Sequence, residues 1–357
     1  SSYGVPYNIT RTLQYGANVG LELQMPLYNQ TLYTSISIAE IVDEMSRLSY
    51  EKAREDLILQ ISKMYYLGQV TAEQIALIKA NITRLEELRD ITQAFFDNGM
   101  AMEVDLKRVN INLENLKVQY DNAQAMMTQQ LNMLKYIMDY PAEKEIGLLP
   151  VNTDSIATVA LTGLSENLYE LQLLQSQVQL AERQKRLISN GYIPSLNLTG
   201  NWRFAAYTDE AYHWFHSGPS NHWFRSYGVG LTLRIPIFDG LDKKYKIRKA
   251  MIDIEMMKLS QLDIRKNLHT QYLNAVNDLM NNQRNFKKQK DNYLLAEEVY
   301  AVTTDRYREG ITSMTEVLQD GMRMSEAQNN YISAHYNYRV TNLMLLKLTG
   351  QIASLFK

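Results

Sequence analysis

The chain has 357 residues, with 37 lysines and arginines against 39 aspartates and glutamates, and its net charge of −2 gives no electrostatic reason to bind nucleic acid. It contains no cysteine, which excludes a disulfide framework, a thiolate nucleophile and a cysteine metal site. No run of 18 apolar residues occurs, so a transmembrane helix is excluded, whereas membrane strands of about ten residues are compatible with the sequence.

The first half predicts one long strand followed by a helical hairpin. Apolar residues recur at odd positions from Ile9 to Leu27 and polar or small residues at even positions, which is typical of a strand with two different faces. Residues 30–96 contain no proline and show helical spacing, and Gly99 suits the left-handed end of a helix. A shorter helix over 101–139 is expected to return along the first.

The second half repeats this order after a linker at 141–160. A helix over 161–190 precedes two strands at 194–207 and 226–237, which an aromatic and polar loop connects. A helix over 241–307 carries apolar residues, five of them aromatic, at six consecutive heptad positions, and these favour packing between helices. Gly310 is expected to end it, and a helix over 312–349 returns.

The two halves are a tandem duplication. Val19–Tyr28 reappears as Val229–Phe238, and an apolar heptad series that begins at Leu106 recurs 211 residues later from Val317. The repeat predicts a first unit at 1–140, a linker at 141–160 and a second unit at 161–357, with a β-hairpin at 194–237. By the same pattern, we expect a further helix and strand ahead of residue 1.

Several short motifs, in this order and duplicated, give the chain a resemblance to a known family. They are Gly191–Leu196 before a strand, Val229–Leu231 leading to Pro236–Gly240, Tyr307 with Gly310, and Tyr336–Tyr338. Together they resemble the TolC-like family of outer-membrane efflux proteins. The resemblance implies a mostly helical chain with membrane strands, in which long coiled-coil hairpins form a tunnel and the strands join a trimeric β-barrel.

The resemblance also implies a function and partners. The protein would be the passive exit duct of a tripartite drug-efflux or type I secretion system, in the outer membrane of a Gram-negative bacterium and extending into the periplasm. Its partners would be two further copies, a periplasmic adaptor, an inner-membrane pump, outer-membrane lipid, and small-molecule or protein export substrates. No cofactor, metal or enzymatic activity is implied.

The same resemblance indicates residues at the helical tips. The tip tyrosine of the family matches Tyr307, while Thr312 stands where a family member has arginine, so the closed-state polar network differs here. The expected constriction residues are Tyr307, Glu316, Gln319 and Asp320. The expected adaptor-docking residues are Asn98, Gly99, Met100, Ala101, Glu309, Gly310, Ile311 and Thr312.

Other interpretations remain open from the sequence alone. The strands could belong to a soluble sandwich, and the helices to a coiled-coil interaction protein without a pore. An adaptor subunit is disfavoured because the chain has two helical hairpins. His213, His216 and His222 could bind a metal, but the neighbouring aromatic residues favour a membrane-interface girdle. The basic run 243–249 favours a solvated helix face over a site for lipid headgroups.

Overall fold

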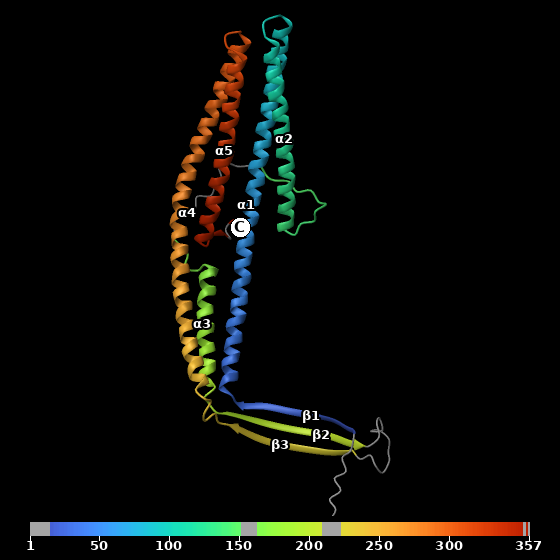
Figure 1. The fold of residues 1–357 in the computed structure, drawn as a ribbon, viewed down its shortest axis with the longest axis vertical. Coiled ribbons are helices and arrows are strands. Elements are labelled where there is room, and N and C mark those ends of the chain that lie inside the picture. Colours follow the sequence, from blue (N-terminus) through green and yellow to red (C-terminus); the bar gives the residue numbers. More distant parts are fainter. Residues whose placement is uncertain (1–14, 151–162, 209–222, 353–354, 356–357) are drawn as a thin grey trace, which may run out of the picture. The chain divides into compact units, whose positions relative to one another are not determined.

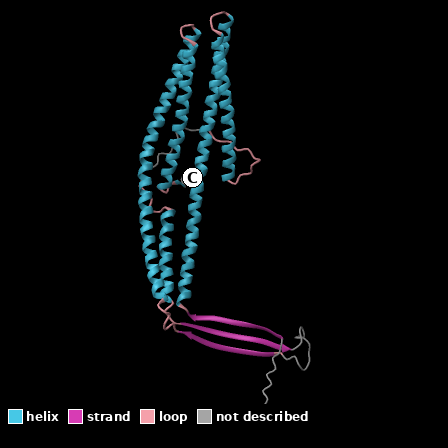
Figure 2. Cartoon of the chain, in the orientation of Figure 1, coloured by secondary structure: helices cyan, strands magenta, loops and turns pink. Residues whose placement is uncertain are grey.

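The structure, a computed structural model, describes residues 15–150, 163–208, 223–352 and 355. The chain divides into two compact units, each of which takes segments from both halves of the repeat. We call residues 1–45 with 175–259 the strand unit, and residues 46–174 with 260–357 the hairpin unit. Figure 1 labels the elements, and Figure 2 shows that the strands form one sheet and that helices make up most of the rest of the described chain.

The strand unit contains a three-stranded antiparallel sheet in the order β1-β2-β3. Its strands are β1 (Tyr15–Tyr28), β2 (Ser195–Thr208) and β3 (Phe224–Arg234). The three predicted strands are therefore confirmed where the structure describes them. The last strand ends three residues earlier than predicted, close to Pro236, whose nitrogen cannot donate a ladder hydrogen bond.

The sheet has one apolar and one polar face, as the alternation predicted. On the apolar face, Leu21, Trp202 and Tyr227 lie opposite one another on the three strands. On the polar face, the neighbouring residue Glu22 of β1 pairs with Asn201 of β2. The apolar side chains are not covered in the subunit: Leu21 is 71% exposed and Val229 is 84% exposed. A sheet that exposes a contiguous apolar face of this kind requires an apolar environment or a partner.

Three helices adjoin the sheet within the strand unit. The Asn29 side chain caps α1 (Gln30–Asp97) by accepting from the Thr31 backbone at 3.1 Å, and Asp239 accepts from the Lys243 backbone at the start of α4 (Asp242–Arg308). The helix α3 (Tyr169–Asn190) is shorter than predicted, because residues 163–168 are not helical.

The hairpin unit contains two helical hairpins with the same limits 211 residues apart. In the first, α1 ends at Asp97 and α2 is Glu103–Ile137; in the second, α4 ends at Arg308 and α5 is Met314–Leu348. The predicted duplication is thus confirmed at the level of helix ends. The tandem boundaries at 1–140, 141–160 and 161–357 remain a prediction, as the compact units cut across them.

Buried side chains from both hairpins form the core of this unit. The cluster nearest the turns joins Leu88 of α1, Val109 of α2, Tyr300 of α4 and Val317 of α5. Tyr293 packs against a second cluster, which contains Tyr331. These contacts confirm that the aromatic heptads of α4 serve helix packing.

The described part of the linker lies against α1. The Leu149 carbonyl accepts from the Gln69 side chain at 2.8 Å, and a Cβ atom at Gly68 would lie 2.7 Å from a methyl group of Leu148. A side chain at position 68 would therefore displace the end of the Leu148 side chain. No helix in the described part of the chain is long and apolar enough to cross a membrane.

Candidate functional site at the helical turns

The two predicted docking turns have the same geometry. Gly99 and Gly310 have φ values of 74° and 76°, a conformation that residues with a Cβ rarely adopt. The Gly99 amide donates to the Phe96 carbonyl and the Met100 amide to the Phe95 carbonyl, and Gly310 and Ile311 repeat this pattern on Tyr307 and Arg306. This double hydrogen bond is the Schellman arrangement that ends a helix sharply.

The turns present apolar side chains to solvent at equivalent positions. Met100 is 68% exposed and Ile311 is 60% exposed, and a Cβ atom at either glycine would meet no atom within 4 Å. Exposed apolar side chains at the end of a rigid hairpin provide contact area for a partner protein. The docking role of residues 98–101 and 309–312 stays a prediction.

The first turn of α5 is fixed by capping. The Ser313 side chain accepts from the Glu316 amide at 3.3 Å, and the Thr312 hydroxyl donates to the Glu316 carboxylate. A negative charge in this first turn also interacts favourably with the helix dipole. Glu316 is thereby held at the turn, with its carboxylate at the exposed end of α5.

Asp320 is buried and joins the two helices of the second hairpin. Its carboxylate accepts from the Thr303 hydroxyl on α4 at 2.8 Å and from Arg323 at 3.1 Å. Both carboxylate oxygens are thus hydrogen-bonded, which a buried charge requires. The structure therefore gives Asp320 a role in holding α4 against α5.

Tyr307 also lies in the core of the subunit. It is 6% exposed and its ring centre lies 5.6 Å from that of Phe95. Its hydroxyl, close to Thr92, has no hydrogen-bond partner within the described residues, and burial raises the pKa of Tyr307 above the ordinary value. Of the four predicted constriction residues, the fold therefore brings Tyr307 and Asp320 into the helix interior and leaves Glu316 and Gln319 exposed.

Gln319 lines an open groove between α2 and α5. The groove has a volume of about 390 Å³, and its other wall is formed by Arg108, Ile111 and Asn112. The Arg108 guanidinium donates to Asp105 at 3.2 Å and to the Thr315 hydroxyl at 3.3 Å, so it links the first turns of the two return helices. The sequence analysis did not identify Arg108, although an acid three residues before a base in a first turn is a recognisable signal.

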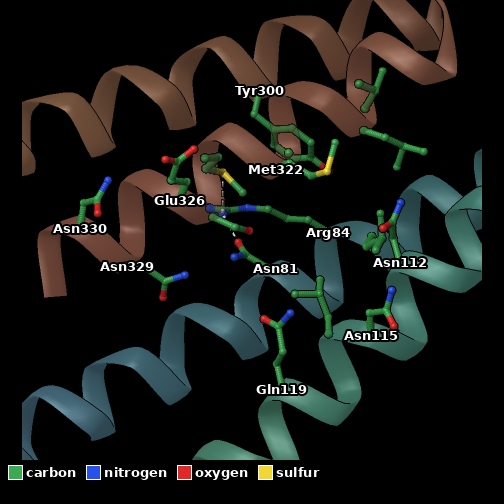
Figure 3. Close-up of a pocket in the computed structure, with 17 residues that line it drawn as sticks. Asn81, Arg84, Asn112, Asn115, Gln119, Tyr300, Met322, Glu326, Asn329 and Asn330 are labelled. Atoms are coloured by element: carbon green, nitrogen blue, oxygen red, sulfur yellow. Dashed lines mark hydrogen bonds between the residues drawn. The ribbon is translucent and has the colours of Figure 1, made fainter. Parts of the chain in front are cut away.

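A second groove of about 440 Å³ lies on the same side of the unit and is rich in amides (Figure 3). Asn112, Asn115 and Gln119 come from α2, whereas Glu326, Asn329 and Asn330 come from α5. At its floor, Arg84 donates to Asn81 at 3.2 Å and pairs with Glu297 of α4. The amides can offer both donors and acceptors, while apolar side chains such as Leu116, Leu318 and Met322 line the rest of the groove.

A buried polar cluster joins α1 and α5, and the sequence analysis did not identify it. Glu73 accepts from the Tyr331 hydroxyl at 2.8 Å and lies 3.2 Å from His335 Nδ1, while Arg339 Nε donates to His335 Nε2 at 3.0 Å. His335 is fully buried. The signal was present as a histidine and an arginine four residues apart on one helix face, but helical spacing alone does not show what faces them.

No group of three or more metal-ligating side chains occurs among the described residues. The histidines at 213, 216 and 222 lie outside those residues. The tips present a capped helix end, exposed apolar side chains, and grooves with both polar and apolar linings.

The comparisons with known proteins agree with this arrangement. The model of the family described as outer membrane efflux protein matches residues 10–138 and 161–351. The chain belongs to this family. The two matched segments correspond to the two halves of the duplication, and the protein is an outer-membrane efflux protein.

The relatives are distant in sequence but similar along most of the chain. Outer membrane protein TolC of Vibrio cholerae is 20% identical, over 97% of this chain and 81% of the relative. The probable efflux pump outer membrane protein TtgC of Pseudomonas putida is 22% identical, over 97% of this chain and 72% of the relative.

The solved structures show the same fold. The outer-membrane channel OprN superposes with a TM-score of 0.76 at 14% identity, covering 94% of this chain and 82% of that one. The Campylobacter jejuni CmeC outer membrane channel has a TM-score of 0.75 at 18% identity, covering 98% and 75%. These relatives are channel proteins. The family match disfavours an interaction protein without a pore, which was the alternative that the sequence left open.

Proposed function

We propose that the protein is one subunit of a homotrimeric exit duct that serves a periplasmic adaptor and an inner-membrane pump, and that it moves its substrates passively without catalysing a reaction. The observation that carries this proposal is the sheet, whose apolar face is uncovered in the subunit and whose opposite face is polar. An apolar face of this kind suits contact with outer-membrane lipid, and a polar face suits a water-filled pore.

The adaptor docks at the helical turns in this proposal. Support comes from Met100 and Ile311, which expose apolar area at equivalent positions of two rigid Schellman turns. Binding of the adaptor opens the duct only if the adaptor has higher affinity for the open state than for the closed state.

The constriction uses two kinds of residue. Glu316 and Gln319 are exposed and contact solutes, whereas Tyr307 and Asp320 are buried and set the position of α5 against α4 and α1. Substitution of the first pair would change the selectivity of the closed or open pore. Substitution of the second pair would change the balance between closed and open states.

The test is ethidium accumulation in the native host. Deletion of the gene is expected to raise accumulation and the wild-type gene to restore it. Met100→Asp combined with Ile311→Asp should abolish restoration, because charges replace the apolar contact area, while Leu57→Asp, at an exposed apolar position of α1, should restore normally. Full restoration by the double variant would contradict docking at the turns, and no effect of the deletion would contradict the efflux duct.

A further inference from the structure

The ends of two helices bring a dense group of basic residues to one end of the sheet. In the strand unit, α3 ends and α4 begins next to the sheet (Figure 1), and the Lys243 ammonium lies 5.0 Å from the centre of the Tyr192 ring. Residues 183–193 and 234–249 contain nine lysines and arginines but two aspartates, although the whole chain has a net charge of −2. We call these nine residues the basic collar: Arg183, Lys185, Arg186, Arg234, Lys243, Lys244, Lys246, Arg248 and Lys249.

The strand unit neutralises only part of the basic collar. Lys243 pairs with Asp239 at 3.2 Å, and Lys246 pairs with Asp242 at 2.6 Å. Three exposed members of the collar form no ion pair with any residue that the structure describes: Lys244, Arg248 and Lys249. Their charges are therefore available to a ligand outside the subunit.

These charges do not help α4 to form. The positive end of a helix dipole lies at the N-terminus, where basic residues are unfavourable. Lys244 and Arg248 are four residues apart in the first turns, so their like charges also repel on one face of the helix. Helix formation thus does not account for the basic run, and a conflict with local preference is typical of functional surfaces.

The internal repeat contains the same junction without the charges. The offset of 211 residues places the segment 243–249 opposite residues 32–38 of α1, which include no charged residue. The helix α1 is nevertheless continuous from Gln30 to Asp97. A strand followed by a long helix therefore forms in this fold without a basic segment at the junction.

Exposed apolar side chains adjoin the basic collar. Between β3 and α4, Ile237 is 93% exposed and Phe238 is 82% exposed, and Tyr245 in the first turn of α4 is 59% exposed. Ile237 also continues the apolar alternation of β3. A basic zone beside apolar and aromatic side chains suits a membrane boundary, where apolar groups contact acyl chains while lysine and arginine reach the phosphates.

We propose that the basic collar binds the phosphate groups of anionic lipids in the leaflet at this end of the sheet, and that Lys244, Arg248 and Lys249 provide the free charge. This inference rests on the proposal that the sheet lies in outer-membrane lipid. The ligand is a lipid surface, because the apolar residues beside the collar need an apolar partner as well. The contact is electrostatic, so salt weakens it.

Thermal unfolding in lipid nanodiscs measures this contact. In low salt, the unfolding midpoint of the full-length protein should be about 3 °C or more higher in mixed phosphatidylglycerol and phosphatidylcholine than in phosphatidylcholine alone, because a ligand of the folded state stabilises it. High salt should remove most of this difference. Inorganic phosphate added to phosphatidylcholine nanodiscs should have no effect, and a rise as large as that with phosphatidylglycerol would overturn the assignment to lipid.

Three variants test the residues. The first neutralises the free charges of the collar: Lys244→Gln, Arg248→Gln and Lys249→Gln. It should unfold as wild type does in phosphatidylcholine and lose the response to phosphatidylglycerol. The second exchanges the same residues but keeps their charges, and it should keep the response: Lys244→Arg, Arg248→Lys and Lys249→Arg. The matched control removes three exposed charges further along α4 and should also keep the response: Lys287→Gln, Lys288→Gln and Lys290→Gln.

The outcomes separate the collar from the duct. A full response to phosphatidylglycerol in the first variant, or its equal loss in the matched control, would overturn the collar and leave the duct intact. A wild-type protein that enters nanodiscs but unfolds at the same midpoint in both lipid mixtures would have the same meaning. A protein that enters neither kind of nanodisc would overturn both the collar and the placement of the sheet in the membrane.

Discussion

The buried cluster around Glu73 supports a quantitative prediction about the joint between the two hairpins. Glu73 accepts hydrogen bonds from the Tyr331 hydroxyl and His335 Nδ1, and Arg339 Nε donates to His335 Nε2. Since Nε2 accepts, the neutral imidazole carries its proton on Nδ1. Glu73→Ala would leave two donors in the interface without an acceptor.

The expected loss follows from the cost of unsatisfied donors. Each buried donor that loses its partner costs about 1–3 kcal/mol, so the loss of two partners should destabilise the fold by about 2–6 kcal/mol. An unfolding entropy of about 2 cal/mol/K per residue converts this loss into a fall of about 3–8 °C in the midpoint of thermal unfolding for a chain of this length.

The assay is thermal unfolding in detergent, followed by circular dichroism at 222 nm. Glu73→Gln should lie between wild type and Glu73→Ala, because its carbonyl oxygen can accept one of the two hydrogen bonds. Glu103→Ala, which removes an exposed carboxylate paired with Lys107, is the control and should not shift the midpoint measurably. A Glu73→Ala protein as stable as this control would refute the role given to the cluster.

Three further predictions concern stability. Burial disfavours the ionised form of Glu73, but hydrogen bonds from His335 and Tyr331 outweigh this effect and hold the Glu73 pKa below its ordinary value. Ionised Glu73 should therefore stabilise the fold above about pH 4, and this contribution should be lost in more acidic solution. Acid titration of the helix content by circular dichroism checks this prediction. Burial and the neighbouring Glu73 raise the Tyr331 pKa, so the neutral hydroxyl should stabilise the fold up to about pH 10 and this contribution should be lost only at higher pH. An unfolding midpoint that does not fall above that pH would count against the prediction. In guanidinium unfolding, Leu88→Ala should lower the free energy of unfolding by about 2–5 kcal/mol, because Leu88 is fully buried. Gly310→Ala should lower it by only about 1 kcal/mol, because φ is positive but no atom lies near the added Cβ. A larger loss for Gly310→Ala than for Leu88→Ala would be inconsistent with the structure.

Most of the fold could be predicted from the sequence because its elements are long and periodic. The alternation sustained from Ile9 to Leu27 indicates a strand, and the absence of proline from 30 to 96 permits one long helix. The 211-residue offset gave a second reading of each helix and placed Gly99 and Gly310 at equivalent turns. The end of β3 was harder to predict, because the alternation of apolar and polar residues continues past Arg234 although the pairing of β3 with β2 ends there.

The site was harder to predict than the fold. Heptad spacing puts Tyr307 in line with Tyr293 and Tyr300, which are packing residues, and the structure places it in the same core. Asp320 was predicted to line the constriction, and its burial could not be foreseen because its partner Thr303 lies on the preceding helix, 17 residues earlier. Such contacts depend on how two helices are rotated against each other, and a single sequence does not specify this rotation.

The most direct measurement of the duct is single-channel conductance of the full-length protein in a planar bilayer. If the protein is an outer-membrane exit duct, it should form a stable pore with a low resting conductance. The conductance should rise when Tyr307→Ala removes the ring contact with Phe95, or when Glu316→Gln removes the charge of the carboxylate that accepts from Thr312. Well-folded trimers that insert but never conduct, with or without these substitutions, would contradict the duct.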